Sequence, residues 1–533
     1  MFLVAALVTA GVGAVAVQSD AVNWKALAAL SHAQDVLRQE HTTNLALIGF
    51  VEPPLPALLQ LPIAWVAPAL LRKGDAVWVL GALIAGLTIA LLNAICAGVG
   101  VGRAARWVFC AVALLNPVYL GMAATGAPDA LYVLLLLGGA WSLLRWQRDA
   151  TLRDLITASL LFGLALIARY DAVVTVIAAT GVVVVQTLRE KEGQAPFSRK
   201  PRTAGLPETS TCPSFPRLEG TLITFLLPIV YIGGLWVLAN WVIIGDPWHF
   251  WRLAWQPNGT AGAATISPWQ GVLGAVAVFA PLPAALWWAL WGGAARRPRL
   301  AAGAAIVLLS PAVAVLAAPG LLGLWLGHAV RSDLPLLPIP ELFAPLLAAG
   351  WLLTACLLGD LQPLFARKSL TKEVCLAGSA ALLAFGCLLV MGPEDRVYLD
   401  FRPALQGRPF GADDAADTKR AAERLRRSPP AGTLVIAGWP GYAVTLYAAR
   451  VEDKVLLVDT KPPTAPVTSV PAGGLLLRDS KPLAKDPQTW RRWQRAVRAA
   501  LPSRPAWVID GWAYYPAQVS PHRSPSPPRR ALQ

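Results

Sequence analysis

The chain has 533 residues, of which 56% are hydrophobic and only 14% are charged, and its formal net charge at pH 7 is +15. A soluble globular domain usually carries about 25% charged residues, so this composition excludes a soluble protein and indicates a polytopic membrane protein. The basic residues are scattered through short loops between apolar runs and a terminal region. Basic loops are the ordinary orientation signal of membrane proteins, and we therefore expect no nucleic-acid partner.

Apolar runs of roughly 17 to 25 residues, long enough to cross a bilayer, occur along most of the chain. We expect eleven membrane spans, at residues 1–18, 77–99, 107–125, 129–145, 154–168, 171–188, 220–244, 269–294, 301–326, 337–358 and 374–392. The cysteines form no CxxC pair and lie mostly in or beside these runs, at Cys96, Cys110, Cys212, Cys356, Cys375 and Cys387. We expect them to be small core residues and not metal ligands or disulfides.

Segment 55–71 decides the topology, because it is apolar but interrupted by prolines. If it lies flat at the interface and the amino terminus is cytoplasmic, most basic loop residues fall on the cytoplasmic side, as the positive-inside rule expects. A span here would invert every later loop and reverse that bias. We therefore expect residues 19–76 to form a long outer loop with juxtamembrane helices, and Asp20 and Asp129 to face the same outer side.

Residues 393–515 read as a small extracytoplasmic α/β domain. Short buried strands are expected at 433–438, 454–459 and 507–510, and helices at 414–427 and 487–501. Strands that alternate with helices favour a parallel sheet. The turn at 438–442, Gly-Trp-Pro-Gly-Tyr, lacks GxGxxG spacing and is read as structural. The tail at 516–533, rich in Pro, Ser and Arg, is expected to be disordered.

Two carboxylates lie at the ends of predicted spans, Asp20 after the first and Asp129 at the start of the fourth. A carboxylate in such a place is costly unless it faces water, a cation or a substrate. Acid–base chemistry at the membrane surface is therefore the first functional hypothesis. The alternatives are that Asp20 merely faces lipid headgroups and that Asp129 caps a helix, a position that the pair Pro128-Asp129 would suit.

Several short motifs follow one another in order and on one predicted membrane side. They are an acid after the first span, Glu52-Pro53-Pro54-Leu55, Leu115-Asn116-Pro117 leading into Gly126-Ala127-Pro128-Asp129-Ala130-Leu131, and residues 166–171, 240–247 and 331–338. Together they resemble the GT-C class of integral-membrane glycosyltransferases, which includes protein O-mannosyltransferases, aminoarabinose transferases and rhizobial lipopolysaccharide-core transferases. The resemblance covers roughly residues 1–392.

The resemblance implies a GT-C-like α-helical membrane domain at 1–392 in the cytoplasmic membrane. It also implies inverting transfer of a hexose or pentose from a polyprenyl-phosphate donor to an envelope glycan, lipid or protein at the outer face. By its match to the family's first-loop acid, Asp20 would be the general base that takes the acceptor hydroxyl proton. Asp129 would bind a metal or position the acceptor. The need for a divalent cation stays open.

The leaving lipid phosphate gathers negative charge, so cationic groups aimed at it lower the barrier. Arg169, at the outer end of a short span, is the first candidate and Arg331 the second. Snorkelling to the interface is the alternative for Arg169. Where many relatives carry a cation directly before Pro-Pro-Leu, this chain carries Glu52, so the usual phosphate contact there is left open.

The loop that follows residue 245 is rich in aromatic residues, namely Trp248, Phe250, Trp251 and Trp255. Tryptophan stacks on sugar rings, but it also forms belts at membrane interfaces. The candidate substrate-binding residues are Glu52, Tyr170, Trp248 and His249.

Two other functions use the same residues: a transporter or flippase of a lipid-linked saccharide, and a non-catalytic GT-C relative. Against a transporter, the two halves show no repeat and the charges gather at one face instead of the midplane.

Overall fold

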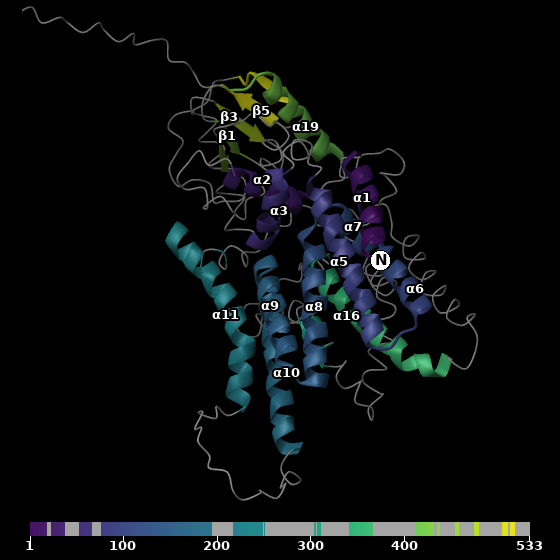
Figure 1. The fold of residues 1–533 in the computed structure, drawn as a ribbon. Coiled ribbons are helices and arrows are strands. Elements are labelled where there is room, and N and C mark those ends of the chain that lie inside the picture. The colour runs from purple at the N-terminus through teal and green to yellow at the C-terminus, as the bar shows by residue number, and fades with distance from the viewer. Residues whose placement is uncertain are drawn as a thin grey trace, which may run out of the picture. The chain divides into compact units, whose positions relative to one another are not determined.

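The computed structural model describes residues 1–18, 23–37, 53–66, 76–193, 217–248, 250, 303–304, 306–310, 340–365, 412–430, 434–437, 454–457, 474–478, 504–509 and 512–516. They belong to two compact units (Figure 1). The helical unit takes in almost all of the chain up to Phe410, and the C-terminal unit contains Gly411–Gln533.

The described helices of the helical unit are α1 (Phe2–Gln18), α2 (Trp24–Leu37), α3 (Pro54–Val66), α5 (Ala76–Gly98), α6 (Arg103–Leu114), α7 (Pro117–Ala124), α8 (Pro128–Asp149), α9 (Leu152–Ala168), α10 (Ala172–Gly193), α11 (Arg217–Ile244) and α16 (Pro340–Phe365). Among the described residues, three stretches are long and apolar enough to cross a membrane: Val77–Gly98, Pro128–Asp149 and Leu218–Ile243. Shorter apolar helices occur at Phe2–Ala16, Ala172–Leu188 and Leu347–Gly359. The predicted spans at 269–294 and 374–392 lie outside the described residues, as does most of 301–326.

The predicted span at 107–125 is wrong as a single helix, because the structure divides it into α6 and α7. Asn116 lies between the two helices, and its side-chain Oδ1 accepts a hydrogen bond of 3.2 Å from the backbone N–H of Tyr119. This is an N-cap for α7, whose first residue is Pro117. Proline lacks the N–H that would continue α6, so the break follows from the local sequence.

The described residues of the predicted loop at 19–76 include two helices, α2 and α3, which pack against each other. Asn23 caps α2 by accepting a 3.1 Å hydrogen bond at Oδ1 from the N–H of Ala26. The two helices have 14 and 13 residues. A helix of that length extends about 20 Å, which is short of a bilayer core of about 30 Å. The outer, juxtamembrane position of these helices stays a prediction.

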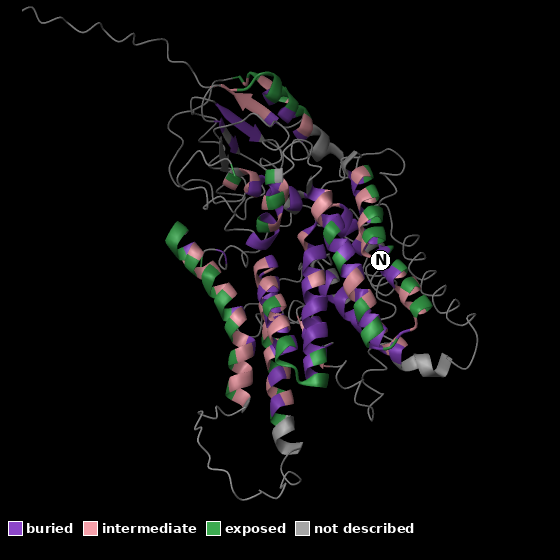
Figure 2. Ribbon diagram, viewed as in Figure 1, coloured by how far each residue is buried: buried purple, intermediate pink, exposed green. Residues whose placement is uncertain are grey.

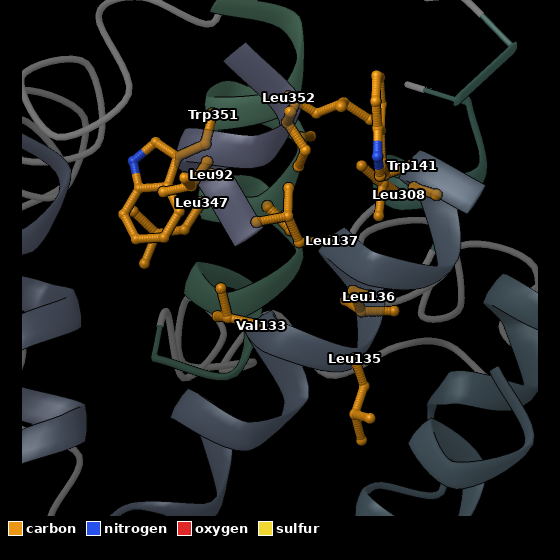
Figure 3. Close-up of a cluster of buried hydrophobic side chains, with 14 of the residues drawn as sticks. Leu92, Val133, Leu135, Leu136, Leu137, Trp141, Leu308, Leu347, Trp351 and Leu352 are labelled. Carbon is orange, nitrogen blue, oxygen red and sulfur yellow. The ribbon is translucent and has the colours of Figure 1, made fainter. Parts of the chain in front are cut away.

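Helix α8 forms the centre of the helical unit and is buried along nearly its whole length (Figure 2). It packs against α9, α5 and α16. The close-up shows its Leu136 and Leu137 among leucines from the neighbouring elements, including Leu92 of α5 and Leu352 of α16 (Figure 3). Helix α11 instead exposes many large apolar side chains. In a bilayer such a face contacts lipid, whereas α8 is covered by protein along most of its length.

Close backbone approaches bring the ends of three helices together at the start of α8. A Cβ on Gly13 of α1 would lie 2.6 Å from Cβ of Trp78 in α5 and 2.9 Å from the carbonyl oxygen of Ala124 in α7. Gly126, in the turn before α8, has a φ of +70°, and a Cβ there would overlap Val77. The carboxyl end of α1 therefore lies at the same end of the helical unit as the amino end of α8.

The C-terminal unit combines helix α19 (Ala412–Arg427) with strands β1 (Leu434–Ala437), β2 (Lys454–Leu457), β3 (Leu475–Arg478), β4 (Trp507–Ile509) and β5 (Trp512–Tyr515). The strand order is β2-β1-β3-β5-β4. Strand β1 is parallel to β2 and β3, whereas β5 is antiparallel to β3 and β4. The buried core of this unit consists of Ala421, Ala422, Leu425, Leu434, Ile436, Leu476 and Trp512.

The sheet is therefore mixed and not wholly parallel as predicted: β4 runs in the same direction as β1 and β3, but it pairs antiparallel with β5, a strand that was not predicted. Only Asp510 and Gly511 separate β4 from β5. A connection of two residues can join only antiparallel neighbours, and Asp-Gly is a typical hairpin dipeptide. The helix predicted at 414–427 and the strands predicted near 434, 454 and 507 are present. The turn at 438–442, the helix predicted at 487–501 and the tail from 517 lie outside the described residues.

Candidate functional site

Asp129 lies in the first turn of α8, where the helix macrodipole favours a negative charge. Ala127 occupies the N-cap position and Pro128 is the first helical residue, so Asp129 does not hold the capping position that the sequence allowed. Its carboxylate instead forms an ion pair with NH1 of Arg169, which is 40 residues away in the sequence. Asp129 is buried, and Arg169 supplies the cation that a carboxylate at the end of a membrane span requires.

Arg169 follows the end of α9 in an extended conformation, with φ −152° and ψ 130°. Its backbone N–H donates to the carbonyl of Ala165 at 2.9 Å, and its carbonyl accepts from the N–H of Ala172 at 3.1 Å, which begins α10. This tight turn directs the side chain back toward the start of α8. Only 15% of the side chain is exposed, so Arg169 does not snorkel.

The same guanidinium binds Asp171 through two parallel hydrogen bonds. Nε donates to Oδ1 at 3.0 Å and NH2 donates to Oδ2 at 2.9 Å. We call Asp129, Arg169 and Asp171 the Asp-Arg-Asp cluster; its formal charge is −1. Burial alone would lower the pKa of Arg169, but Asp171 and Asp129 outweigh it and hold the pKa well above its ordinary value. The arginine is therefore a fixed positive charge between two carboxylates.

Tyr132 covers one face of the guanidinium. Cζ of Arg169 lies 5.0 Å from the centre of the Tyr132 ring, within the range of a cation–π interaction. Tyr132 and Asp129 are three residues apart on α8 and so share one face of the helix. Arg169 is thus held at its edges by carboxylates and at one face by an aromatic ring.

Tyr170 lies between the two charged residues of the turn, but its ring packs elsewhere. The ring centre is 5.0 Å from that of Phe250, which in turn is 6.4 Å from Trp236 of α11. Tyr170 is buried in this aromatic group. Trp248, two residues before Phe250, is 57% exposed, and its backbone N–H donates to Asp246 Oδ1 at 3.2 Å. The aromatic loop therefore begins beside the α9–α10 turn.

The structure brings together Asp129, Arg169 and Tyr170 from the predicted set. Asp20, Glu52, His249 and Arg331 lie outside the described residues. Their roles stay predictions, although α1 ends two residues before Asp20 and α3 begins two residues after Glu52. Sequence reasoning did not assign a role to Asp171 or Tyr132. Their signals were local: Asp171 is two residues from Arg169, and Tyr132 is one helical turn from Asp129.

A divalent cation has no preformed site in the described part of the chain, where no group of three or more His, Cys, Asp or Glu residues is placed to hold a metal. The two carboxylates of the Asp-Arg-Asp cluster share a cation already, since both bind Arg169. The described cysteines Cys96, Cys110 and Cys356 form no disulfide with one another and are buried in the hydrophobic core. For these three the predicted role as small core residues is confirmed.

Residues 52–196 match the family of dolichyl-phosphate-mannose-protein mannosyltransferases. The chain is also similar to the crystal structure of ArnT from Cupriavidus metallidurans bound to undecaprenyl phosphate, with a TM-score of 0.51 and 16% sequence identity, over 96% of this chain and 97% of that chain. The chain has the GT-C fold. No curated protein sequence matches it significantly.

The GT-C fold confirms the class that the ordered motifs resemble, and it confirms an α-helical multi-pass membrane protein. The family match begins at Glu52 and ends beyond α10, so it contains the whole Asp-Arg-Asp cluster and Tyr132. The cluster thus lies within the part of the chain that matches the mannosyltransferase family.

Proposed function

We propose that this GT-C protein is a membrane glycosyltransferase. It transfers a sugar, with inversion, from a polyprenyl-phosphate donor to a cell-envelope acceptor at the outer face of the cytoplasmic membrane. The observation that carries the proposal is the buried Asp-Arg-Asp cluster at the end of α8 where α1 also ends. The matching family, which is named for a dolichyl-phosphate sugar, and the similar structure, which is bound to undecaprenyl phosphate, support a lipid-phosphate donor.

The reaction needs a base, because the acceptor hydroxyl must lose its proton as its oxygen attacks the anomeric carbon. We assign this role to Asp20, which follows the end of α1 by two residues. The new carbon–oxygen bond forms as the bond from the anomeric carbon to the phosphate oxygen breaks, and the electron pair leaves with the lipid phosphate. Asp129 orients the acceptor.

The leaving phosphate needs a cation. Of the two candidates we assign this contact to Arg331, because Arg169 already donates at least three of its five N–H groups to carboxylates. An anionic phosphate would meet a cluster whose formal charge is negative. Glu52, Trp248 and His249 are assigned to the sugar or the acceptor, in keeping with their predicted outer positions.

The test is transfer by the purified full-length protein in lipid nanodiscs, supplied with a panel of polyprenyl-phosphate hexoses and pentoses and with envelope extract as acceptor. Release of free polyprenyl phosphate and labelling of the acceptor are measured. Asp20→Asn should lower turnover by about 10² to 10⁴, the range of a lost general base, and leave donor binding intact.

Asp149→Asn is the matched control. It removes an exposed carboxylate at the opposite end of α8, where Asp149 pairs with Arg148, and it should not change turnover. Undiminished transfer by the Asp20 variant would remove the proposed base. A wild-type protein that moves labelled lipid across vesicles and transfers no sugar would instead be a transporter.

A further inference from the structure

We infer that Asp171 is a positioning residue for the reaction proposed above: it fixes the guanidinium of Arg169, and through that group it fixes the carboxylate of Asp129. This inference rests on the proposed function and deepens it. It gives Arg169 a role toward a neighbouring carboxylate in place of a direct contact with the donor phosphate.

The geometry of the double hydrogen bond between Arg169 and Asp171, which we call the fork, supports this assignment. Both oxygens of Asp171 are engaged, one by Nε and one by NH2 of Arg169, at 3.0 and 2.9 Å. Such a two-point contact fixes the plane of a guanidinium, which a single hydrogen bond does not. Asp171 occupies the edge of the guanidinium that carries Nε and NH2. The remaining nitrogen, NH1, binds Asp129, which is 40 residues away in the sequence.

The turn that carries both residues is itself anchored. Besides the backbone bonds of Arg169, the N–H of Val174 donates to the carbonyl of Asp171 at 3.1 Å. Tyr170, between them, packs against Phe250 on the side of α11. Arg169 and Asp171 therefore start from fixed backbone positions, and their side chains meet without reorganisation of the turn.

Charge and access argue against a phosphate ligand. The cluster carries one positive and two negative formal charges, and Tyr132 covers a face of the guanidinium at 5.0 Å. Three of the five N–H groups of the guanidinium already bind carboxylates, so an approaching phosphate would meet two negative charges at the edges of this group. The same arrangement suits a neutral hydroxyl group, which can donate to an oxygen of Asp129 once that carboxylate is held in one orientation.

The two roles predict opposite results for Asp171→Asn. If Arg169 positions Asp129, loss of the fork lets both side chains move, and a misplacement of about 1 Å in a positioned group lowers turnover by about 10². The KM for the polyprenyl-phosphate donor stays unchanged. If Arg169 were a phosphate ligand, release from Asp171 would make it more available and lower the donor KM.

The experiment measures kcat and donor KM of the full-length protein in nanodiscs for Asp171→Asn, Arg169→Lys and the double variant. Lysine cannot form the two-point contact, so the double variant should be no slower than Arg169→Lys alone. Asp171→Glu retains a carboxylate that can accept both N–H groups, so its turnover should lie between those of the wild-type protein and Asp171→Asn. If Asp171→Asn does not fold, Asp171→Glu replaces it in the same measurement.

Asp154→Asn is the matched control. Asp154 is a buried carboxylate at the opposite end of α8 and α9, where it pairs with Arg145 at 3.2 Å. Its loss removes an ion pair between a buried carboxylate and an arginine that is 45% exposed, far from the cluster, and should leave kcat unchanged. A wild-type kcat in Asp171→Asn, a lower donor KM, or additive losses in the double variant would each overturn the inference. Failure of the proposed function is distinct, since the wild-type protein would then transfer no sugar.

Discussion

Arg169 is the residue on which the local energetics depend most. Two carboxylates and a tyrosine ring surround it in a site from which most water is excluded. Removal of one partner of a buried ion pair leaves an uncompensated charge, which costs far more than the pair itself contributes. The cluster therefore constrains its three members together, and substitutions in it should affect both stability and turnover.

Arg169→Met tests this at the residue scale. It leaves Asp129 and Asp171 without their cation, and we expect a loss of about 3–5 kcal/mol in the free energy of unfolding. The control is Arg148→Met, which breaks a pair whose side chains are 47% and 38% exposed and should cost at most about 1 kcal/mol. Thermal unfolding in detergent measures both; equal shifts would mean that the cluster is not a buried charge site.

At the scale of elements, glycines set the distances between α1, α5 and α7. Small residues let transmembrane helices approach closely, and the contacts at Gly13 leave no room for a Cβ. The carboxyl end of α1, which leads to Asp20, is positioned by this contact. Packing between helices is thus coupled to the placement of the proposed base.

Gly13→Ala should cost about 1–3 kcal/mol through overpacking against Trp78 and Ala124, and it should lower transfer by moving the end of α1. Gly11→Ala on the same helix is the control, because a Cβ at Gly11 would meet nothing within 4 Å; it should be neutral or slightly stabilising. Unfolding temperature and turnover of the two variants are compared. Identical behaviour would contradict the close packing.

At the scale of the whole molecule, the described residues form two separate hydrophobic cores. The residues of one core lie between Ala5 and Cys356 in the sequence, and those of the other lie between Ala421 and Trp512. Units with separate cores can unfold separately, since neither needs the other to bury its apolar side chains.

Trp512→Ala should therefore unfold the C-terminal unit alone. The loss of a fully buried tryptophan costs about 3–5 kcal/mol. We expect this cost to exceed the free energy of unfolding of the C-terminal unit. Limited proteolysis of the full-length protein should digest the region after residue 411 and leave the helical unit intact. Val508→Ala, at a side chain that is 61% exposed, should keep the wild-type pattern. Simultaneous digestion of both units would show that they fold as one.

Local features of the sequence determined much of the architecture. Long apolar runs predicted α1, α5, α8, α9, α10, α11 and α16, because a segment that crosses or fills a membrane must satisfy its own backbone hydrogen bonds as a helix. Two errors had local signals as well. Asn116-Pro117 marks the break between α6 and α7, and Asp510-Gly511 marks the antiparallel hairpin.

The partners of the site residues were decided by the tertiary structure. The sequence by itself determined that Asp129 and Arg169 lie at the ends of apolar helices, since both follow directly from the pattern of hydrophobic residues. Their ion pair, the fork to Asp171 and the ring of Tyr132 depend on how α8 packs against the α9–α10 turn. Contacts over 40 residues arise from side-chain packing between helices, and no local periodicity encodes them.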